Sequence, residues 1–454
     1  MELKYGRPSV DFNQVKLGDK RLDNRLCKTV DALTENSTSS ILGGCGTKHD
    51  AKAFYALLSN GKFSREKLEE AAQQATVNRI ISHGLTEVLL PQDTSDINFD
   101  GHKKTEDLGY SSNNTKGVKI HSCLALNLDG APLGLLMQQY QTRETAKQEQ
   151  SKSELKKRPI EEKESYRWIE TVRGCVKLLP KNVKSIVICD REGDFYELYA
   201  EMLSLETQFA IRVTQNRLTK DGERSIQQLK NTPTCGTVEI TISRNSRKNT
   251  PERQAIMDVS YCSVTVKRPK HASATIAEEL EMTLLRVVEA TAESKPLEWI
   301  IATNISVCDA TSAMKVVEYY GHRWKIERFH YILKSGCQVE KIQQRTYERI
   351  LAVLLIYSVI AAFLLSLTYF ARTEPETPCD KFFDDQEWKI LYRLINRKKT
   401  PPSKPYPLVT AIAYLGELGS YKHSPCDGPY GVKALWQGLS KLFDAIEFAD
   451  RLMG

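Results

Sequence analysis

One uncharged apolar run constrains this chain more than any other feature. Residues 350–370 read ILAVLLIYSVIAAFLLSLTYF, a segment long enough to cross a bilayer, with Ser358, Ser366 and Thr368 as its weak points. A single span between large polar regions, without an orienting lysine cluster, is poor membrane design. A helix that is apolar on all sides is also typical of the centre of a large domain. The run therefore predicts a buried core helix and no membrane association.

The composition agrees with a globular protein of several domains. The chain has 454 residues, of which 41% are apolar and 27% charged. Its formal net charge of +7 favours an anionic partner only mildly, because that charge is spread over a long chain. Eleven cysteines without a C-x-x-C pair indicate reduced thiols and a cytoplasmic protein. The N-terminal residues lack the apolar core of a secretory signal.

Four different polar groups share one face of a predicted helix over residues 312–334. Tyr320, Arg323, Glu327 and Lys334 are spaced at relative positions that correspond to about 0, 300, 340 and 320° around a helix axis. A phenol, a guanidinium, a carboxylate and an ammonium thus lie on one stripe roughly 60° wide. A merely solvated face does not need this mixture, so the stripe predicts a functional site. His322 and His330 lie off the stripe and are expected to be structural.

Two further acids follow apolar runs that read as strands. Asp93 closes the run that begins at residue 87, and Asp190 closes the run that begins at residue 183. Ligands bind at the carboxyl ends of strands in open α/β sheets, and hard divalent ions prefer clustered carboxylates. With Glu327 as the third acid, these residues could hold two Mg²⁺ ions about 4 Å apart for phosphodiester chemistry. The alternative is that each Asp is a turn or cap residue.

The remaining patterns divide the chain into three predicted domains. Residues 1–72 read as a helical domain in which Asp19 caps a helix that carries Arg21 and Arg25, with further helices over 50–59 and after Ser64. Residues 73–372 read as an α/β domain with a β-rich insertion at about 216–295. Residues 373–454 form a Pro-punctuated C-terminal unit with an amphipathic last helix over 431–452.

These motifs carry a family resemblance. Asp93-Thr-Ser, Asp190-Arg-Glu-Gly-Asp194 and the Tyr-x2-Arg-x3-Glu-x6-Lys signature resemble the DDE transposases of bacterial insertion sequences, most closely the YREK-signature group, insertion sequence family four. The resemblance implies an RNase H-like catalytic core with a β-rich insertion between Asp190 and Glu327. It also implies an N-terminal helical DNA-binding domain and a C-terminal helical dimerisation domain.

The resemblance also implies roles for individual residues. Asp93, Asp190 and Glu327 would be catalytic and would bind two Mg²⁺ ions, with Mn²⁺ able to substitute. Tyr320, Arg323, Lys334 and Arg212 would hold DNA phosphates, and Trp299 would stack on a flipped base. On spacing alone, Trp299 could equally be a core residue of its strand.

The N-terminal helices would read transposon ends, with Lys20, Arg21 and Arg25 as candidate contacts. Relatives tend to carry Arg in the second helix, whereas Ala53-Phe54-Tyr55-Ala56 is apolar here. The detail of end recognition therefore does not transfer.

Taken together, the sequence predicts a bacterial cut-and-paste transposase associated with the nucleoid in the cytoplasm. Its partners would be double-stranded DNA, as transposon ends and as target, and a second copy in a homodimeric synaptic complex. Cleavage would pass through a hairpin, followed by transfer of the 3′ ends. Two alternatives are an RNase H-like nuclease or resolvase without strand transfer, and a non-catalytic DNA-binding regulator.

Overall fold

The chain forms two compact units, each assembled from separate stretches of sequence. The computed structural model describes residues 6–35, 41–112, 114–144, 158–242, 253–290, 296–397, 400–419 and 432–453. The first unit comprises Met1–Leu85, Thr94–Gln148 and Glu327–Gly454, and the second comprises Thr86–Asp93 and Glu149–Ile326. Strand β1 (Glu87–Asn98) and helix α10 (Trp324–Tyr331) each continue from one unit into the other.

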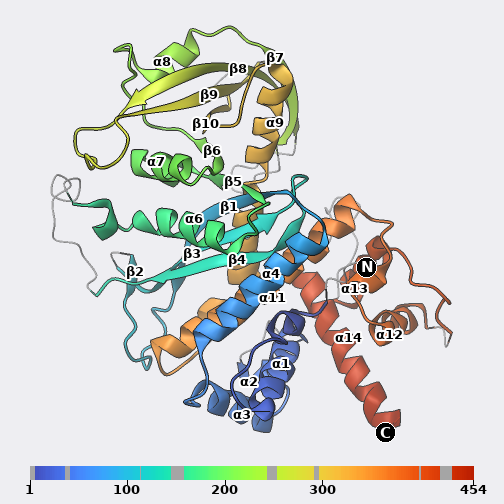
Figure 1. Ribbon diagram of the computed structural model, residues 1–454. Helices are drawn as coiled ribbons and strands as arrows, with labels where there is room; N and C mark the ends of the chain where they lie inside the picture. Colours follow the sequence, from blue (N-terminus) through green and yellow to red (C-terminus); the bar gives the residue numbers. More distant parts are fainter. Residues whose placement is uncertain are drawn as a thin grey trace. The chain divides into compact units, whose positions relative to one another are not determined.

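The second unit is a mixed sheet with helices around it (Figure 1). The first half of β1 pairs in parallel with β5 (Lys184–Cys189), which pairs in parallel with β6 (Gln208–Arg212). Parallel neighbours need a crossover, and α7 (Tyr196–Ser204) supplies it between β5 and β6. The apolar run before Asp190 is confirmed as β5, and helix α6 (Tyr166–Leu178) precedes it.

The described part of the predicted insertion is confirmed as β-rich, and its strands extend the same sheet. The order onward from β6 is β10-β9-β8-β7, all antiparallel to their neighbours. These strands are β7 (Gly236–Ile242), β8 (Arg253–Lys267), β9 (Glu279–Glu289) and β10 (Glu298–Thr303). Helices α8 (Ser225–Lys230) and α9 (Ala310–Gly321) both pack against β8. Residues 243–252 and 291–295 of the predicted insertion lie outside the described residues.

The first unit contains an antiparallel sheet backed by two long helices. Strand β3 (Thr115–Leu126) pairs with β2 (Tyr110–Ser112) and with β4 (Pro132–Gln141). Helices α4 (Arg65–Ser82) and α11 (Tyr347–Thr373) both pack against β4 and against each other (Figure 1). The predicted boundary at residue 72 falls inside α4. Residues 145–157, which follow β4, lie outside the described residues.

Helix α11 confirms the prediction for the apolar run. It is long and apolar enough to cross a membrane by length and composition, but 94% of its most apolar window is buried inside the protein. The three hydroxyls that weakened the membrane reading, those of Ser358, Ser366 and Thr368, donate to acceptors inside the protein. Ser366 Oγ donates to main-chain oxygens, lying 3.2 Å from that of Pro132 and 3.0 Å from that of Ala362. The run therefore forms the core of the first unit.

Helices at both ends of the chain complete the first unit. Helix α4 begins after Ser64 as predicted, and the Ser64 side chain caps it by accepting from the Lys67 N–H at 3.2 Å. Asp19 accepts from the Arg21 N–H at 2.9 Å at the start of α1, which confirms its capping role. The N-terminal helices are η1 (Pro8–Phe12), α1 (Lys20–Glu35), α2 (Ile41–Gly44) and α3 (Lys48–Leu58). The C-terminal helices are η6 (Cys379–Lys381), α12 (Asp385–Asn396), α13 (Leu408–Leu418) and α14 (Val432–Met453).

Candidate active site

The register of two parallel strands places the predicted acids Asp93 and Asp190 at the same level. Leu90 is opposite Val187 and Pro91 is opposite Ile188 in the β1–β5 pair. Two residues further on, Asp93 and Asp190 occupy equivalent positions on neighbouring strands that lie about 4.8 Å apart. Asp190 directly follows β5 as predicted, but the prediction that Asp93 closes its strand is wrong, because β1 continues past it to Asn98. Both acids are half-buried, whereas the strand residues before them are buried. The apolar runs therefore position a pair of carboxylates next to each other on two neighbouring strands.

The pKa of the buried Cys189 thiol shows which charged groups lie near Asp190. Burial is the main reason that its pKa is raised well above the usual value, and the carboxylates of Asp190 and Asp93 raise it further. The Arg323 guanidinium opposes them. Asp190 Oδ1 also accepts from the Glu192 N–H at 2.8 Å, so the turn η3 (Arg191–Gly193) fixes that carboxylate. The charges of Asp93, Asp190 and Arg323 thus all lie near enough to Cys189 to shift the pKa of its thiol.

Tyr320 brings the predicted phosphate-binding residues into the same cluster. Burial raises the pKa of its phenol, the guanidiniums of Arg323 and Arg212 oppose that rise, and Asp190 adds to it. Tyr320 and Arg323 are 3% and 6% exposed. The ring of Trp299 meets the Tyr320 ring edge-on, with centroids 6.0 Å apart. Tyr320, Arg323, Arg212 and Trp299 therefore form one group beside Asp190.

The predicted single helix over 312–334 is wrong, because the segment is divided into three pieces. Helix α9 ends at Gly321, and His322 and Arg323 bond back three residues, to the carbonyls of Tyr319 and Tyr320. Helix α10 follows, and a π-helix, η4 (Ile332–Gly336), replaces its continuation. The uniform angle per residue assumed for the polar stripe does not apply across these breaks.

Glu327 and Lys334 belong to the first unit. Glu327 is half-buried in the first turn of α10, where the helix dipole favours a carboxylate. Lys334 lies in the π-helix and is about one-third exposed. Its Nζ donates to the main-chain oxygen of Asp96 at 2.8 Å and lies 3.6 Å from Glu340 Oε1. Lys334 is therefore held beside the second half of β1.

The structure agrees with the expected structural role of His330 but does not group three metal ligands in the described residues. His330 is 6% exposed and lies in the interior, as expected for a structural residue. In the described parts of the chain, no three His, Cys, Asp or Glu side chains are grouped to hold one metal ion. The Asp93–Asp190 pair is placed, and the assignment of Glu327 as the third ligand stays a prediction.

The N-terminal candidates differ in their availability. Lys20 and Arg21 are exposed, and Arg21 pairs with Asp19 at 3.0 Å. Arg25 instead bonds to Asp50 at 2.6 Å, which ties α1 to α3. Arg25 thus has a structural partner within its own helical bundle, whereas Lys20 and Arg21 point their charges to the surface.

Sequence reasoning missed a buried ion pair that supports the site. Asp194, 2% exposed, pairs with Arg217 at 2.5 Å and accepts from the Thr214 and Gln215 N–H groups at 2.6 and 2.8 Å. It therefore ties the turn after Asp190 to the segment after Arg212. The only signal in the sequence was its place in the Asp190-Arg-Glu-Gly-Asp194 motif.

Comparison with known proteins identifies the family. A family model described as Transposase DDE domain matches residues 93–364, which begins at Asp93 and includes Asp190 and Glu327. The chain belongs to the DDE transposase family. A second model, described as Transposase DNA-binding, matches residues 9–63 of this transposase. The protein is accordingly a DNA-binding enzyme of the class that cleaves DNA and transfers strands.

One similar solved structure is a piggyBac transposase synaptic complex with hairpin DNA, determined by cryo-EM. It is 10% identical, with a TM-score of 0.37, and the match covers 98% of this chain and 82% of that chain.

Proposed function

We propose that this protein is a cut-and-paste DNA transposase of the YREK group, with an RNase H-like catalytic core. It binds transposon ends, nicks them, lets the freed 3′-hydroxyl attack the opposite strand to give a hairpin, reopens the hairpin and joins the 3′ ends to target DNA. The observation that carries the proposal is the β1–β5 register, which sets Asp93 and Asp190 side by side, Asp93 within β1 and Asp190 just after β5. Membership of the DDE family supports the reaction class.

The acids present fit a divalent metal ion. Carboxylates at equivalent positions of neighbouring strands offer the hard oxygen donors that Mg²⁺ and Mn²⁺ prefer. Asp93, Asp190 and Glu327 would hold two such ions, which supply Lewis-acid stabilisation of the charge that develops on phosphate. In the metal-free state, the close carboxylates of Asp93 and Asp190 repel each other, so cation binding would relieve that repulsion.

The chain's own cations and aromatic residues account for substrate positioning in this proposal. Arg323 and Arg212 would bind phosphate oxygens near Asp190, and Lys334 would bind another. The Tyr320 phenol has a raised pKa, so it stays protonated and can donate a hydrogen bond to phosphate. Trp299, half-buried beside Tyr320, would stack on the base that leaves the duplex during hairpin formation.

The outer parts of the chain would provide recognition and assembly. The proposed organisation has an end-binding domain at residues 1–72, a catalytic domain at 73–372 and a dimerisation domain at 373–454. Lys20 and Arg21 are the better-placed end contacts because they are exposed. Two copies in a synaptic complex would hold two ends together, in the cytoplasm of a bacterium.

The test uses the full-length protein with labelled DNA ends that flank its gene, Mg²⁺ and a target plasmid. We expect hairpins and end-to-target joined products. Asp190→Asn and Glu327→Gln should abolish cleavage while leaving end binding within about twofold, because they remove charge without changing shape. Cleaved ends without joined products would show a nuclease, and binding without cleavage would show a regulator. Equal loss of binding and cleavage in Glu327→Gln would mean that Glu327 is structural.

A further inference from the structure

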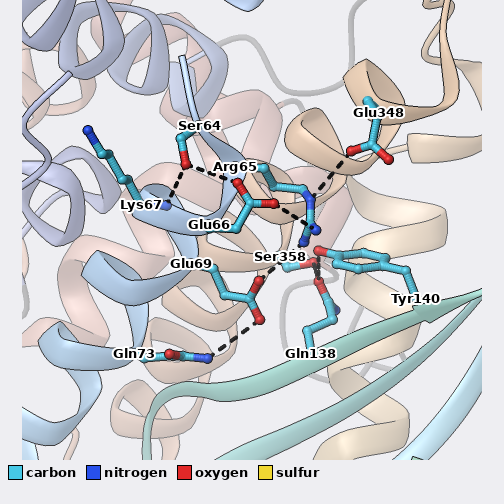
Figure 2. A network of polar contacts seen from close by, with 10 residues as sticks. All are labelled: Ser64, Arg65, Glu66, Lys67, Glu69, Gln73, Gln138, Tyr140, Glu348 and Ser358. Carbon is cyan, nitrogen blue, oxygen red and sulfur yellow. Dashed lines mark hydrogen bonds and ion pairs between the residues drawn. The ribbon is translucent and has the colours of Figure 1, made fainter. Parts of the chain in front are cut away.

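A chain of buried hydrogen bonds connects helix α10 to the core of the first unit. His330 Nε2 lies 3.2 Å from Ser122 Oγ on β3, and Ser122 Oγ accepts from Gln138 Nε2 on β4 at 2.9 Å. Gln138 Oε1 in turn accepts from Ser358 of α11 and from Tyr140, each at 2.9 Å. Figure 2 shows Gln138, Tyr140 and Ser358 converging between β4 and α11. We call His330, Ser122 and Gln138 the buried triad.

The buried triad sits where unpaired polar groups are costly. Ser122, Gln138 and His330 are 0%, 3% and 6% exposed, and Ser358 is fully buried. Leaving one buried donor or acceptor unsatisfied costs about 1–3 kcal/mol. Any rotation of α10 that broke the His330–Ser122 contact would carry that penalty, so the triad favours one orientation of the helix.

The protonation of the triad follows from its neighbours. Burial, helped by the charge of Lys334, lowers the pKa of His330 to about 3, so the ring is neutral at physiological pH. Ser122 Oγ already accepts from Gln138, so its own proton is available for His330 Nε2. Ser358 shares its proton between Gln138 Oε1 and the Leu354 carbonyl, 2.8 Å away. Each link therefore has a donor and an acceptor.

Helix α10 needs such an anchor more than an ordinary helix does. It has eight residues, begins after the break at His322 and Arg323, and passes directly into the π-helix η4. Helices this short are not held straight by their own hydrogen bonds. Glu327 lies three residues before His330, a spacing that places two side chains on adjoining parts of a helix surface. What orients His330 therefore also orients Glu327.

We propose that the buried triad of His330, Ser122 and Gln138 is a positioning network that sets the orientation of Glu327 for its role in DNA cleavage. The inference rests on the proposed function of Glu327. None of the three residues touches DNA; they act through the helix. Loss of a partner that orients a metal ligand typically lowers activity or metal affinity 10- to 100-fold, which sets the size of the expected effect.

The test compares two substitutions of His330 in the full-length protein bound to its DNA ends. His330→Phe keeps a ring of similar shape but removes the acceptor, whereas His330→Gln can present an oxygen near the position of Nε2. We expect His330→Phe to lower the single-turnover cleavage rate about 10- to 100-fold, with end binding unchanged, and His330→Gln to recover most of it. Mn²⁺ affinity of the protein–DNA complex, measured by electron paramagnetic resonance, should fall in parallel with the rate.

Two buried serines, Ser122 on β3 and Ser366 on α11, separate positioning from stability. Ser122→Ala removes a single hydroxyl of the triad and should lower the rate in the same direction as His330→Phe, even if the phenylalanine variant folds poorly. Ser366→Ala is the matched control, because this buried serine bonds only to the main-chain oxygens of Pro132 and Ala362. It should lower the melting temperature without changing the cleavage rate.

The failures of the two proposals are distinguishable. If Glu327→Gln abolishes cleavage while His330→Phe and Ser122→Ala cleave at the wild-type rate, the positioning inference is wrong and the function stands. A loss in Ser366→Ala that matches the loss in Ser122→Ala would also overturn it, because stability alone would then explain both. If Glu327→Gln itself cleaves normally, the proposed function of Glu327 fails.

Discussion

Tyr320 and Arg323 illustrate how single residues can be prepared for an anionic substrate before it arrives. Both side chains are almost fully buried. The charge of Asp190 raises the pKa of the Tyr320 phenol, and the charge of Arg323 lowers the pKa of both Tyr320 and Cys189. A buried guanidinium is held by its surroundings and loses little freedom when it binds phosphate. Their burial is therefore compatible with a binding role beside Asp190. An exposed lysine in the same place would lose more side-chain freedom on binding phosphate.

Lys334 gives a prediction about salt dependence at this scale. Lys334→Ala should weaken binding of DNA ends and reduce the slope of log K against log salt by about 0.9, the value for one lost phosphate contact on duplex DNA. The measurement is fluorescence anisotropy across a salt series. Lys341→Ala is the control, because Lys341 is exposed nearby and bonds to Gln338 Oε1 at 2.8 Å. Identical slopes for all three proteins would exclude a phosphate contact by Lys334.

Trp299 gives a second residue-scale prediction, on the order of the reaction steps. Its indole is half-buried against Tyr320, and a base that leaves the duplex could stack on the part that remains exposed. Trp299→Ala should slow hairpin formation by an amount equivalent to about 1–3 kcal/mol of stacking while leaving the first nick nearly unchanged. The rate of hairpin formation by Trp299→Phe should lie between the rates of the wild type and Trp299→Ala. Gel analysis of nicked and hairpin products over time separates the steps, and an equal slowing of both would assign Trp299 to the core instead.

At the scale of elements, the sequence predicted what depends on neighbours along the chain and missed what depends on distant contacts. The strands that lead to Asp93 and Asp190 were predictable because apolar runs buried on both faces have a plain pattern, but the continuation of β1 from Asp93 to Asn98 was missed. The break after Gly321 and the π-helix η4 were not, since periodicity carries no sign of where a helix changes its hydrogen bonding. The Asp194–Arg217 pair was missed because residues so far apart meet only in the folded unit.

That ion pair carries a prediction about stability. Asp194→Asn keeps the shape of the side chain but leaves Arg217 as an uncompensated charge that is 8% exposed. Removing one partner of a buried pair costs about 3–5 kcal/mol. Urea denaturation followed by tryptophan fluorescence should show a loss of this size for the second unit. Asp221→Asn, at an exposed site in the same unit, should be nearly neutral, and a neutral Asp194→Asn would contradict the supporting role.

At the scale of the whole molecule, the division of the chain into units follows the predicted ligands closely. The chain leaves the second unit immediately after Asp93 and again immediately before Glu327. The family model spans both crossings, so the enzyme's identity is a property of the full catalytic segment and of neither unit alone. The family model treats residues 93–364 as one segment because it follows the order of residues along the chain. The two units divide that segment because they are defined by contacts in the folded protein.

The C-terminal helix gives the last prediction, which concerns assembly. Helix α14 packs on α12, α13 and α1 of its own unit, and its apolar residues Leu435, Trp436 and Leu439 are buried there. Phe448, near its end, is instead 64% exposed. If α14 makes the dimer contact proposed for the synaptic complex, an exposed aromatic residue is a natural anchor for the second copy.

Phe448→Glu should therefore abolish complexes that contain two DNA ends while leaving binding of a single end unchanged, as measured by native gels and mass photometry. The added charge would face an apolar surface of the partner without a counter-ion, so the loss should be at least tenfold. Val409→Glu is the matched control, because Val409 of α13 is also exposed and the substitution adds the same charge. Normal pairing of ends by Phe448→Glu would place the dimer contact elsewhere than the end of α14.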